Sequence, residues 1–185
     1  MRKLILGKTL LESYQSIPRI ISSIDRLVVE SSAHSYSLTV VRDDTMQKMQ
    51  AVIDLIERKK RLMRIKLAVE EGIKACTKLD AKILVRYYFD RAHTLLIAEE
   101  LGMNRRNVHR KINVAVENLV ERLNSVGYNS AKLKELITNE GWIVGIYNGY
   151  VDKFIKKDPS LVYLTPPKQT TAVNKFALGS TIISH

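Results

Sequence analysis

The stretch LLIAEELGMNRRNVHRKINVAVENL, residues 95–119, determines the fold predicted for this chain. It begins with a short apolar segment that ends at a single glycine, Gly102. In the segment that follows, four cationic side chains fall within seven residues that include no acid: Arg105, Arg106, Arg110 and Lys111. Such a concentration of positive charge at the start of a helix needs a partner that explains it.

Two helices joined by a tight turn are predicted around this glycine. Thr94 is a suitable cap for the first helix. The apolar positions of that helix are Leu95, Ala98 and Leu101. Gly102 adopts the positive φ of a tight turn at low cost, and Asn104 is a suitable cap for the second helix. Gly102 lies four residues after Ala98 and six residues before Val108, which is the spacing of a helix-turn-helix unit.

The second helix, from Arg105 to Leu123, has one apolar stripe and one basic face. The stripe consists of Val108, Ile112, Ala115, Leu119 and Leu123. The residues that project away from it are Arg106, His109, Arg110 and Asn113, with Arg105, Asn107 and Lys111 at the flanks. Many amphipathic helices have a basic face for no functional reason. Here the spacing, the caps and the absence of acids coincide, and we therefore expect this face to bind duplex DNA.

The chemistry of these side chains suits the major groove, which admits one α-helix. An arginine donates two hydrogen bonds to O6 and N7 of guanine, and an asparagine bridges N6 and N7 of adenine. Cations at the flanks of the helix hold phosphates, which fixes its position without reading sequence. Base readers and phosphate contacts are therefore both expected on this face.

Residues 79–123, LDAKILVRYYFDRAHTLLIAEELGMNRRNVHRKINVAVENLVERL, resemble the region-four helix-turn-helix domain of bacterial sigma factors. The recognition helix of that family reads a promoter element in the major groove. The resemblance thus implies a reading role for Arg105, Arg106, His109 and Arg110. Residues 10–123, with long charged helices ahead of this unit, also resemble phage-encoded regulators of the RinA/ArpU type, which control late or morphogenesis genes. No sigma-like segment for core-polymerase binding or DNA melting is found, so independent sigma activity is not expected.

The composition agrees with a globular protein that binds an anionic partner. The chain has 185 residues, 45% of them hydrophobic, and a net charge of +11. With 8 glycines and 4 prolines, a loop-rich all-β protein is disfavoured. Cys76 is the only cysteine, so no internal disulfide and no cysteine-based zinc cluster can form. No uncharged apolar run approaches the roughly 20 residues of a membrane span. A soluble protein in the cytoplasm of a bacterial host is expected.

Catalytic chemistry is not expected. The sequence has no glycine-rich phosphate loop, no HExxH motif and no nucleophile elbow. The histidines are scattered without metal-ligand spacing: His34, His93, His109 and His185. Tyr87 and Tyr88 could stack on bases, but at helical spacing one of them is expected in the core. The sequence therefore predicts no catalytic residue, no cofactor and no metal.

Two longer helices are predicted ahead of this unit. Apolar residues recur at helical spacing over residues 10–28, where Pro18 either kinks the helix or leaves Ser16 as the start of a second one. Residues 31–45 are predicted as a loop with a short extended run at 37–41.

A heptad pattern follows from Thr45. Its steps are interrupted once, by Lys60, and its apolar members are Met46, Met49, Ile53, Ile56, Met63 and Leu67. Such a seam predicts pairing with another helix, either as a hairpin within the chain or between chains.

Further helices are predicted on both sides of the helix-turn-helix unit. A short one, capped by Asp80, precedes it, and another begins near Ser130. Residues 141–159 fit either a β-hairpin or, as we favour, one helix with an apolar face. Close helix packing would then be possible at three glycines spaced four apart: Gly141, Gly145 and Gly149.

The sequence as a whole predicts an all-α protein with long helices for oligomerisation in residues 1–76, a DNA-binding domain in 77–127 and a helical extension with a flexible tail in 128–185. Its expected function is sequence-specific binding of double-stranded DNA as a transcription regulator of phage or prophage late genes. RNA polymerase and further copies of the chain are candidate partners; a membrane is not. The alternative is a DNA-packaging protein of the phage small-terminase kind, which recognises DNA as an oligomer. A third interpretation is an interaction protein that binds an acidic partner.

Overall fold

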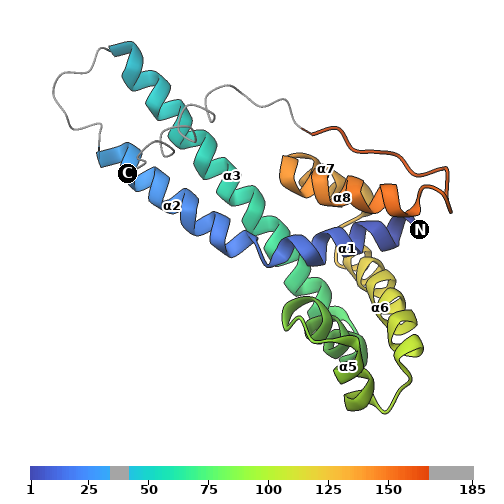
Figure 1. The fold of residues 1–185 in the computed structure, drawn as a ribbon. Helices are drawn as coiled ribbons and strands as arrows, with labels where there is room; N and C mark the ends of the chain where they lie inside the picture. The colour runs from blue at the N-terminus through green and yellow to red at the C-terminus, as the bar shows by residue number, and fades with distance from the viewer. Residues whose placement is uncertain (34–41, 167–185) are drawn as a thin grey trace, which may run out of the picture.

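A computed structural model of the chain describes residues 1–33 and 42–166, and every regular element in these ranges is helical (Figure 1). In chain order the elements are α1 (Arg2–Tyr14), α2 (Ile17–Ala33), α3 (Arg42–Ala75), α4 (Lys78–Leu84), the π-helical turn η2 (Val85–Phe89), α5 (Thr94–Leu101), α6 (Arg105–Ser125), α7 (Ser130–Thr138) and α8 (Gly141–Phe154). The predicted all-α class is confirmed for these ranges. None of the described helices is long and apolar enough to cross a membrane.

Helix α1 lies at the centre of the fold, between α8 on one side and α6 on the other (Figure 1). Its buried apolar side chains include Ile5, Leu6, Leu10 and Leu11. Gly7 faces α6 so closely that a Cβ atom at this position would lie 2.5 Å from Cγ1 of Val116. The missing side chain at Gly7 is therefore what lets the two helices touch.

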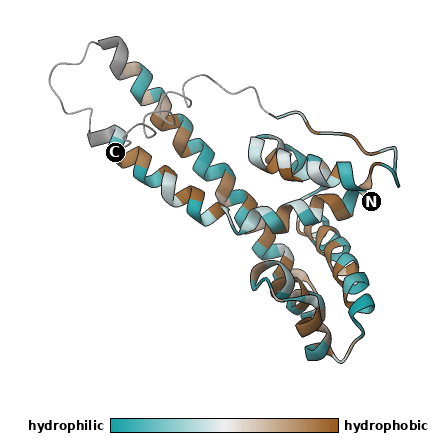
Figure 2. Ribbon diagram, in the orientation of Figure 1, coloured by the Kyte–Doolittle hydropathy of each residue, from teal (hydrophilic) through white to brown (hydrophobic). Residues whose placement is uncertain are grey.

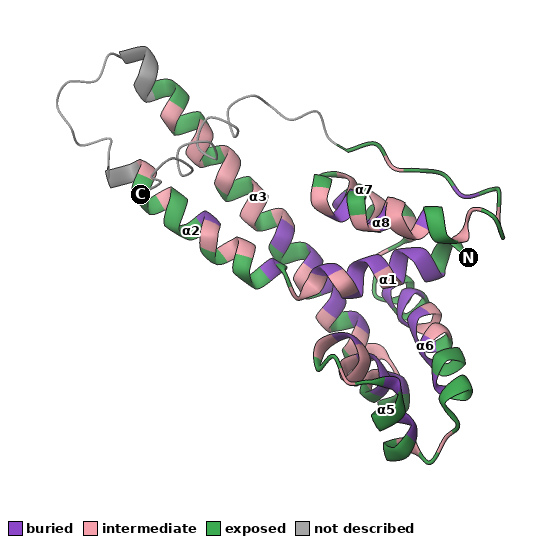
Figure 3. Ribbon diagram, viewed as in Figure 1, coloured by how far each residue is buried: buried purple, intermediate pink, exposed green. Residues whose placement is uncertain are grey.

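One main apolar cluster receives side chains from all three predicted segments, for example Leu62, Leu119 and Ile137. Buried residues gather where α1, α3 and α6 meet, and the apolar sides of these helices turn toward one another (Figures 2 and 3). A smaller cluster joins α1 to α8 and to the segment after it, through Ile5, Tyr147, Val151 and Leu161. The N-terminal helix therefore holds the later helices together.

The helix is interrupted between α1 and α2, and this interruption confirms one of the two alternatives for Pro18. A second helix starts at Ile17 instead of one kinked helix continuing. Pro18 lies in the first turn of α2, where a backbone N–H would have no partner within the helix. The carbonyl of Ser16 accepts a hydrogen bond from the N–H of Ile20 at 3.1 Å, which closes that turn.

Helices α2 and α3 run side by side as a hairpin that extends away from the other helices (Figure 1). Both helices extend into the predicted loop region, because α2 continues to Ala33 and α3 begins at Arg42. The extended run predicted at 37–41 lies outside the described residues.

The predicted heptad seam does not form the contact within this hairpin. Its members remain 39–66% exposed: Met46, Met49, Ile53, Ile56, Met63 and Leu67. Helix α3 buries a different face, with Leu62, Ile65, Ala68 and Val69. Helix α3 thus has apolar residues on two sides: the heptad stripe is exposed, and the buried residues lie where the heptad does not describe them.

Two predicted helix caps are wrong by one or a few residues. Thr77 instead of Asp80 caps α4, and the Asp80 carboxylate accepts a hydrogen bond from Nδ2 of Asn118 at 2.9 Å. His93 instead of Thr94 caps α5, with Nδ1 accepting from the N–H of Leu95. Asp80 and Thr94 are both buried in the first turn of their helices, so tertiary packing displaces the cap toward the exposed residue before them.

The residues after α6 form helices α7 and α8, so residues 141–154 are helical as favoured, and the β-hairpin alternative is wrong. The predicted packing role of the glycines in α8 is not found, since a Cβ at Gly145 or Gly149 would meet no atom of the described residues within 4 Å. The start of α8 is fixed by the buried carboxylate of Glu140, which accepts hydrogen bonds from Arg58 and from Nε1 of Trp142.

The chain turns back along α8 after that helix ends. Asn148 and Leu164 exchange two hydrogen bonds, each 2.9 Å long, which hold the segment in place. The remainder of the predicted tail, residues 167–185, lies outside the described residues.

The contact at Gly7 predicts a stability difference between two glycine substitutions. Gly7→Ala forces its Cβ against Val116 and should lower the free energy of unfolding by about 1–3 kcal/mol. Gly145→Ala is the matched control, because the new methyl group meets open space within a helix and should stabilise by about 0.5–1 kcal/mol. Urea unfolding of both variants measures the difference; equal effects would contradict the close contact.

Candidate functional site

A tight turn connects α5 to α6, and the two local signals predicted for it are present. Gly102 ends α5 with a φ of 60°, in the left-handed region. The N–H of Met103 donates to the carbonyl of Ala98 at 2.9 Å, which closes the end of the helix. Asn104 then caps α6, its side-chain oxygen accepting from the N–H of Arg106 at 2.9 Å. The direction in which α6 starts is therefore fixed by backbone and cap together.

The inner surface of this unit is apolar and tightly packed. Ala98 and Val108 are buried as predicted. The side of α5 that is buried differs from the prediction: Leu95 is 51% exposed, and Ile97 is buried in its place. In a helix of eight residues, burial of Thr94, Ile97 and Ala98 leaves Leu95 on the outer side.

The apolar stripe of α6 packs against α1, α3, α4 and α5. All five predicted stripe residues are buried: Val108, Ile112, Ala115, Leu119 and Leu123. Because this side of the helix is occupied by the core, the opposite side is the one presented to solvent.

The structure brings the predicted site residues together on the first turns of α6. Six of them are exposed and Asn113 is half-buried; the exposed ones are Arg105, Arg106, Asn107, His109, Arg110 and Lys111. The exposed start of α6 lies beside the turn, at the end of the molecule opposite the tip of the α2–α3 hairpin (Figures 1 and 3).

The charge of these residues is not neutralised within the described parts of the chain. We refer to Arg105, Arg106, Arg110 and Lys111 as the α6 cation cluster, and none of its members forms an ion pair with an acid in residues 1–31 or 46–166. The nearby helix α5 offers Glu100, but Arg86 already binds it. The hydrogen bond from Arg86 holds the pKa of Glu100 below its usual value.

The position of the cluster on its helix is electrostatically unfavourable. A helix N-terminus carries a partial positive charge, and an acid in the first turn usually balances it. The first turn of α6 has no acid and begins with Arg105 and Arg106. The helix dipole and the cluster therefore both favour an anion at this end of the helix.

A side chain that the sequence analysis did not single out fixes the start of the unit. The Gln15 carboxamide, at the end of α1, donates to the carbonyls of Tyr88 and Phe89 at 2.6 and 2.9 Å. Its oxygen accepts from the guanidinium of Arg91 at 2.7 Å. Residues 90–93, which lead into α5, are thereby attached to α1. No pattern along the sequence indicates this, because the partners are more than 70 residues apart.

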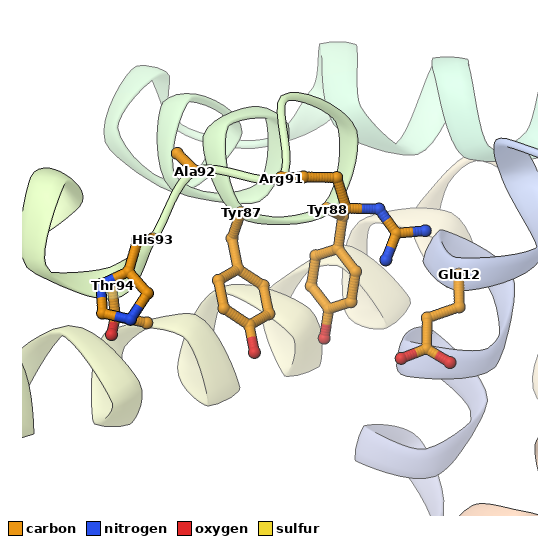
Figure 4. Close-up of a pocket in the computed structure, with 7 residues that line it drawn as sticks. All are labelled: Glu12, Tyr87, Tyr88, Arg91, Ala92, His93 and Thr94. Atoms are coloured by element: carbon orange, nitrogen blue, oxygen red, sulfur yellow. The ribbon is translucent and has the colours of Figure 1, made fainter.

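A pocket of about 370 Å³ lies beside this anchor (Figure 4). Its lining consists of Glu12, Tyr87, Tyr88, Arg91, Ala92, His93 and Thr94. Tyr88 is buried in the core, as expected for one of the two adjacent tyrosines, and burial raises the pKa of its hydroxyl. The two charged groups already have partners, since Glu12 accepts from the hydroxyl of Tyr150 and Arg91 donates to Gln15. The pocket is thus a space left where α1 packs beside η2 and the segment that follows it.

Metal-ligating and nucleophilic groups do not gather in the described structure. Within residues 1–33 and 42–166 there is no group of three His, Cys, Asp or Glu side chains that could hold a metal ion. Cys76 is half-buried at the end of α3, and burial raises the pKa of its thiol. The α6 cation cluster is therefore the strongest candidate for a functional site.

Comparison with protein-family models, with curated proteins and with solved structures gives no match to this chain. A functional proposal therefore depends on the geometry and charge of the site and on the motif resemblance of residues 79–123.

The turn itself yields a prediction about backbone strain. Gly102→Ala should lower the free energy of unfolding by about 1 kcal/mol, because a φ of 60° is unfavourable for a residue with a Cβ. No neighbour lies within 4 Å of that Cβ, so packing contributes nothing to the effect. Gly102→Asn is the control and should cost less, since asparagine tolerates this region better. Thermal unfolding ranks the three proteins; an alanine variant as stable as the parent would refute the strain.

Proposed function

We propose that this chain binds double-stranded DNA in a sequence-specific manner, with the first turns of α6 in the major groove, and that it regulates transcription. The observation that carries the proposal is the α6 cation cluster. Its side chains are exposed, lack an acidic partner in the described residues and lie at a helix N-terminus whose other face is buried. A polyanion of regular shape supplies the missing counter-charge.

The size and spacing of the exposed face suit the groove. A helix with its side chains is about 10–12 Å across, and the major groove is about 12 Å wide. Arg106 and Arg110 are one turn apart on the same face, and Asn113 follows three residues later. These three side chains can meet successive base edges, while Arg105, Asn107 and Lys111 approach the phosphates on either side.

The rigidity of α6 supports recognition. Helices α1, α3 and α4 pack against its buried side, and the Gly102 turn and the Asn104 cap fix its start. Little conformational entropy is therefore lost when the exposed face docks, and more of the contact energy appears as affinity. A preorganised helix also keeps its side chains in one register on the bases.

The regulatory role rests on the resemblance of residues 79–123 to the region-four domain of sigma factors. On the same ground we propose that the regulated genes are phage or prophage late genes, that the chain contacts RNA polymerase and that it acts in the bacterial cytoplasm. A DNA-packaging protein of the small-terminase kind is the second candidate, favoured by the exposed apolar stripe on α3, which suits an oligomer. Stoichiometry separates them: a dimer on DNA supports regulation, and a ring-sized oligomer supports packaging.

Selection of bound sites from random duplex DNA tests the proposal directly. A recovered consensus supports sequence-specific binding, whereas enrichment without any shared sequence would leave only non-specific attraction. Failure to retain duplex DNA, together with binding to an acidic protein, would favour the third interpretation.

Salt should weaken DNA binding steeply. If the four cations of the α6 cluster each neutralise one phosphate, the affinity should fall about a hundredfold between about 50 and 200 mM salt, because counterions are released on binding. Fluorescence anisotropy with a labelled duplex measures this slope. A flat response over this range would contradict docking of the cluster on the backbone.

Substitutions within α6 should separate base reading from phosphate binding. Arg110→Ala should weaken the selected site by about 1–3 kcal/mol and relax the preference at one or two base pairs. Lys111→Ala should weaken all sequences by the same factor. Arg19→Ala is the control, because it removes an exposed cation from α2, outside α6.

The comparison requires affinities for both the selected duplex and a scrambled one. If Arg110→Ala lowers both by an equal factor, Arg110 contacts phosphate only and the assignment of base readers is wrong. If Arg19→Ala is as damaging as the α6 variants, total charge and not the α6 face governs binding.

A further inference from the structure

Helix α3 carries an exposed apolar stripe that no other described part of the chain covers. Its members are Met46, Met49, Ile53, Ile56, Met63 and Leu67, each between 39% and 66% exposed. They follow alternating steps of three and four residues, so they lie along one side of the helix over roughly 32 Å. Large contiguous apolar surfaces on a protein mark sites that another molecule covers.

No other described helix covers this side of α3. The hairpin partner α2 lies on a different side, where the Lys59 ammonium pairs with the carboxylate of Asp25. Helix α6 packs on a third position, since a Cβ at Gly72 would meet Leu119 and Leu123. Among the described residues nothing covers the stripe, which lies on a hairpin that extends away from the other helices (Figure 1).

We propose that the stripe binds the same stripe of a second copy of the chain, with the two α3 helices antiparallel. Over residues 46–67 the stripe and the positions that flank it form one continuous seam about three heptads long, which no proline or glycine interrupts. The heptad steps also give the geometry in which side chains of two helices interlock.

Apolar pairing sets the register of the two helices. When the midpoint lies near residue 58, Met49 packs against the partner's Leu67 and Ile53 packs against the partner's Met63. The stripe is then covered from Met49 to Leu67. Ile56 lies opposite the stem of the partner's Lys60, whose methylene groups are apolar.

Charge complementarity supports the same register. Lys60 is the one polar interruption of the stripe, and Glu57 lies beside it; both are exposed and neither has an ion-pair partner in the described parts of the chain. In the antiparallel pair, Lys60 comes to the same height and the same side as the partner's Glu57. The two-fold axis repeats this contact, so both interrupting lysines receive a carboxylate.

A parallel pair would be electrostatically unfavourable. Residues of equal number then lie opposite each other in the seam, and Lys60 would face the partner's Lys60. Lys59 would also lie near the partner's Arg64, because parallel coiled coils bring these flanking positions together. Like charges at such distances are destabilising. The antiparallel pair also brings Lys59 near the partner's Lys59 beside the two-fold axis, but it gives both lysines within the seam a carboxylate, so the charges of α3 favour the antiparallel arrangement.

The oligomeric state of the full chain tests the proposal first. Sedimentation across a dilution series from micromolar to hundreds of micromolar should give a species of twice the 21.1 kDa chain mass. Replacing Ile53 and Met63 by Gln should weaken the dimer about a hundredfold or more while leaving the fold intact, because both residues are exposed in the single chain. Val162→Gln, an exposed apolar residue outside α3, is the control and should have no effect. Circular dichroism confirms that each variant is folded.

Charge reversal tests the ion pair. Lys60→Glu places a carboxylate beside the partner's Glu57 and should weaken the dimer about tenfold. Adding Glu57→Lys to the same chain restores opposite charges across the interface and should recover most of the affinity. A double variant as weak as the single one would exclude this pair and the register derived from it.

Cysteine cross-linking decides the orientation in a Cys76→Ser background. Chains with both Met49→Cys and Leu67→Cys should form inter-chain disulfides under mild oxidation, and neither single variant should. Cross-linking of Met49→Cys alone would show a parallel pair and overturn the proposal. A parent chain that remains monomeric throughout the dilution series overturns it as well. A ring-sized oligomer whose stability is unchanged by the α3 substitutions would also overturn the proposal.

Discussion

At Gly7, helix α1 passes so close to Val116 of α6 that no side chain fits between them. This contact places α1 across the middle of the molecule, with α8 on its other side. Through it, the first residues of the chain become part of the support for a helix that lies more than 90 residues later. Three long helices, α3, α6 and α8, are held in place by packing on α1.

The crossing also determines which side of α6 is available for function. Core contacts occupy its apolar stripe, so the charged residues of its first turns can only face solvent. Their charge is left without partners in the described structure, while other cations, such as Arg58 and Arg86, are paired with carboxylates. Proteins that break a local electrostatic rule in this way commonly do so at functional positions. The proposed DNA contact explains why a helix begins with two arginines and no acid.

Helix α3 has two apolar sides, one buried in the core and one exposed. One side of it, with Leu62, Ile65 and Val69, belongs to the core of the single chain. The side with the heptad steps faces outward and carries apolar residues that the core does not use. The separation of these two sides means that substitutions on the outer one can alter association without unfolding the chain. The residues of α3 that are buried in the single chain are thus different from those that the proposed dimer would bury.

The sequence by itself determined those features that depend on a few neighbouring residues. The glycine at 102, the cap at 104 and the apolar steps of α6 were all predictable, because a left-handed turn, a cap and a helical stripe are each specified within about one or two turns of chain. The break before Pro18 and the helical state of α8 were predictable on similar grounds. Only the tertiary structure decided that Ile97 and not Leu95 faces the core, that Thr77 and His93 are the caps, and that the heptad stripe of α3 stays exposed. Each of these depends on which distant helix packs nearby, and the burial of a side chain is a property of that packing and not of the sequence around it.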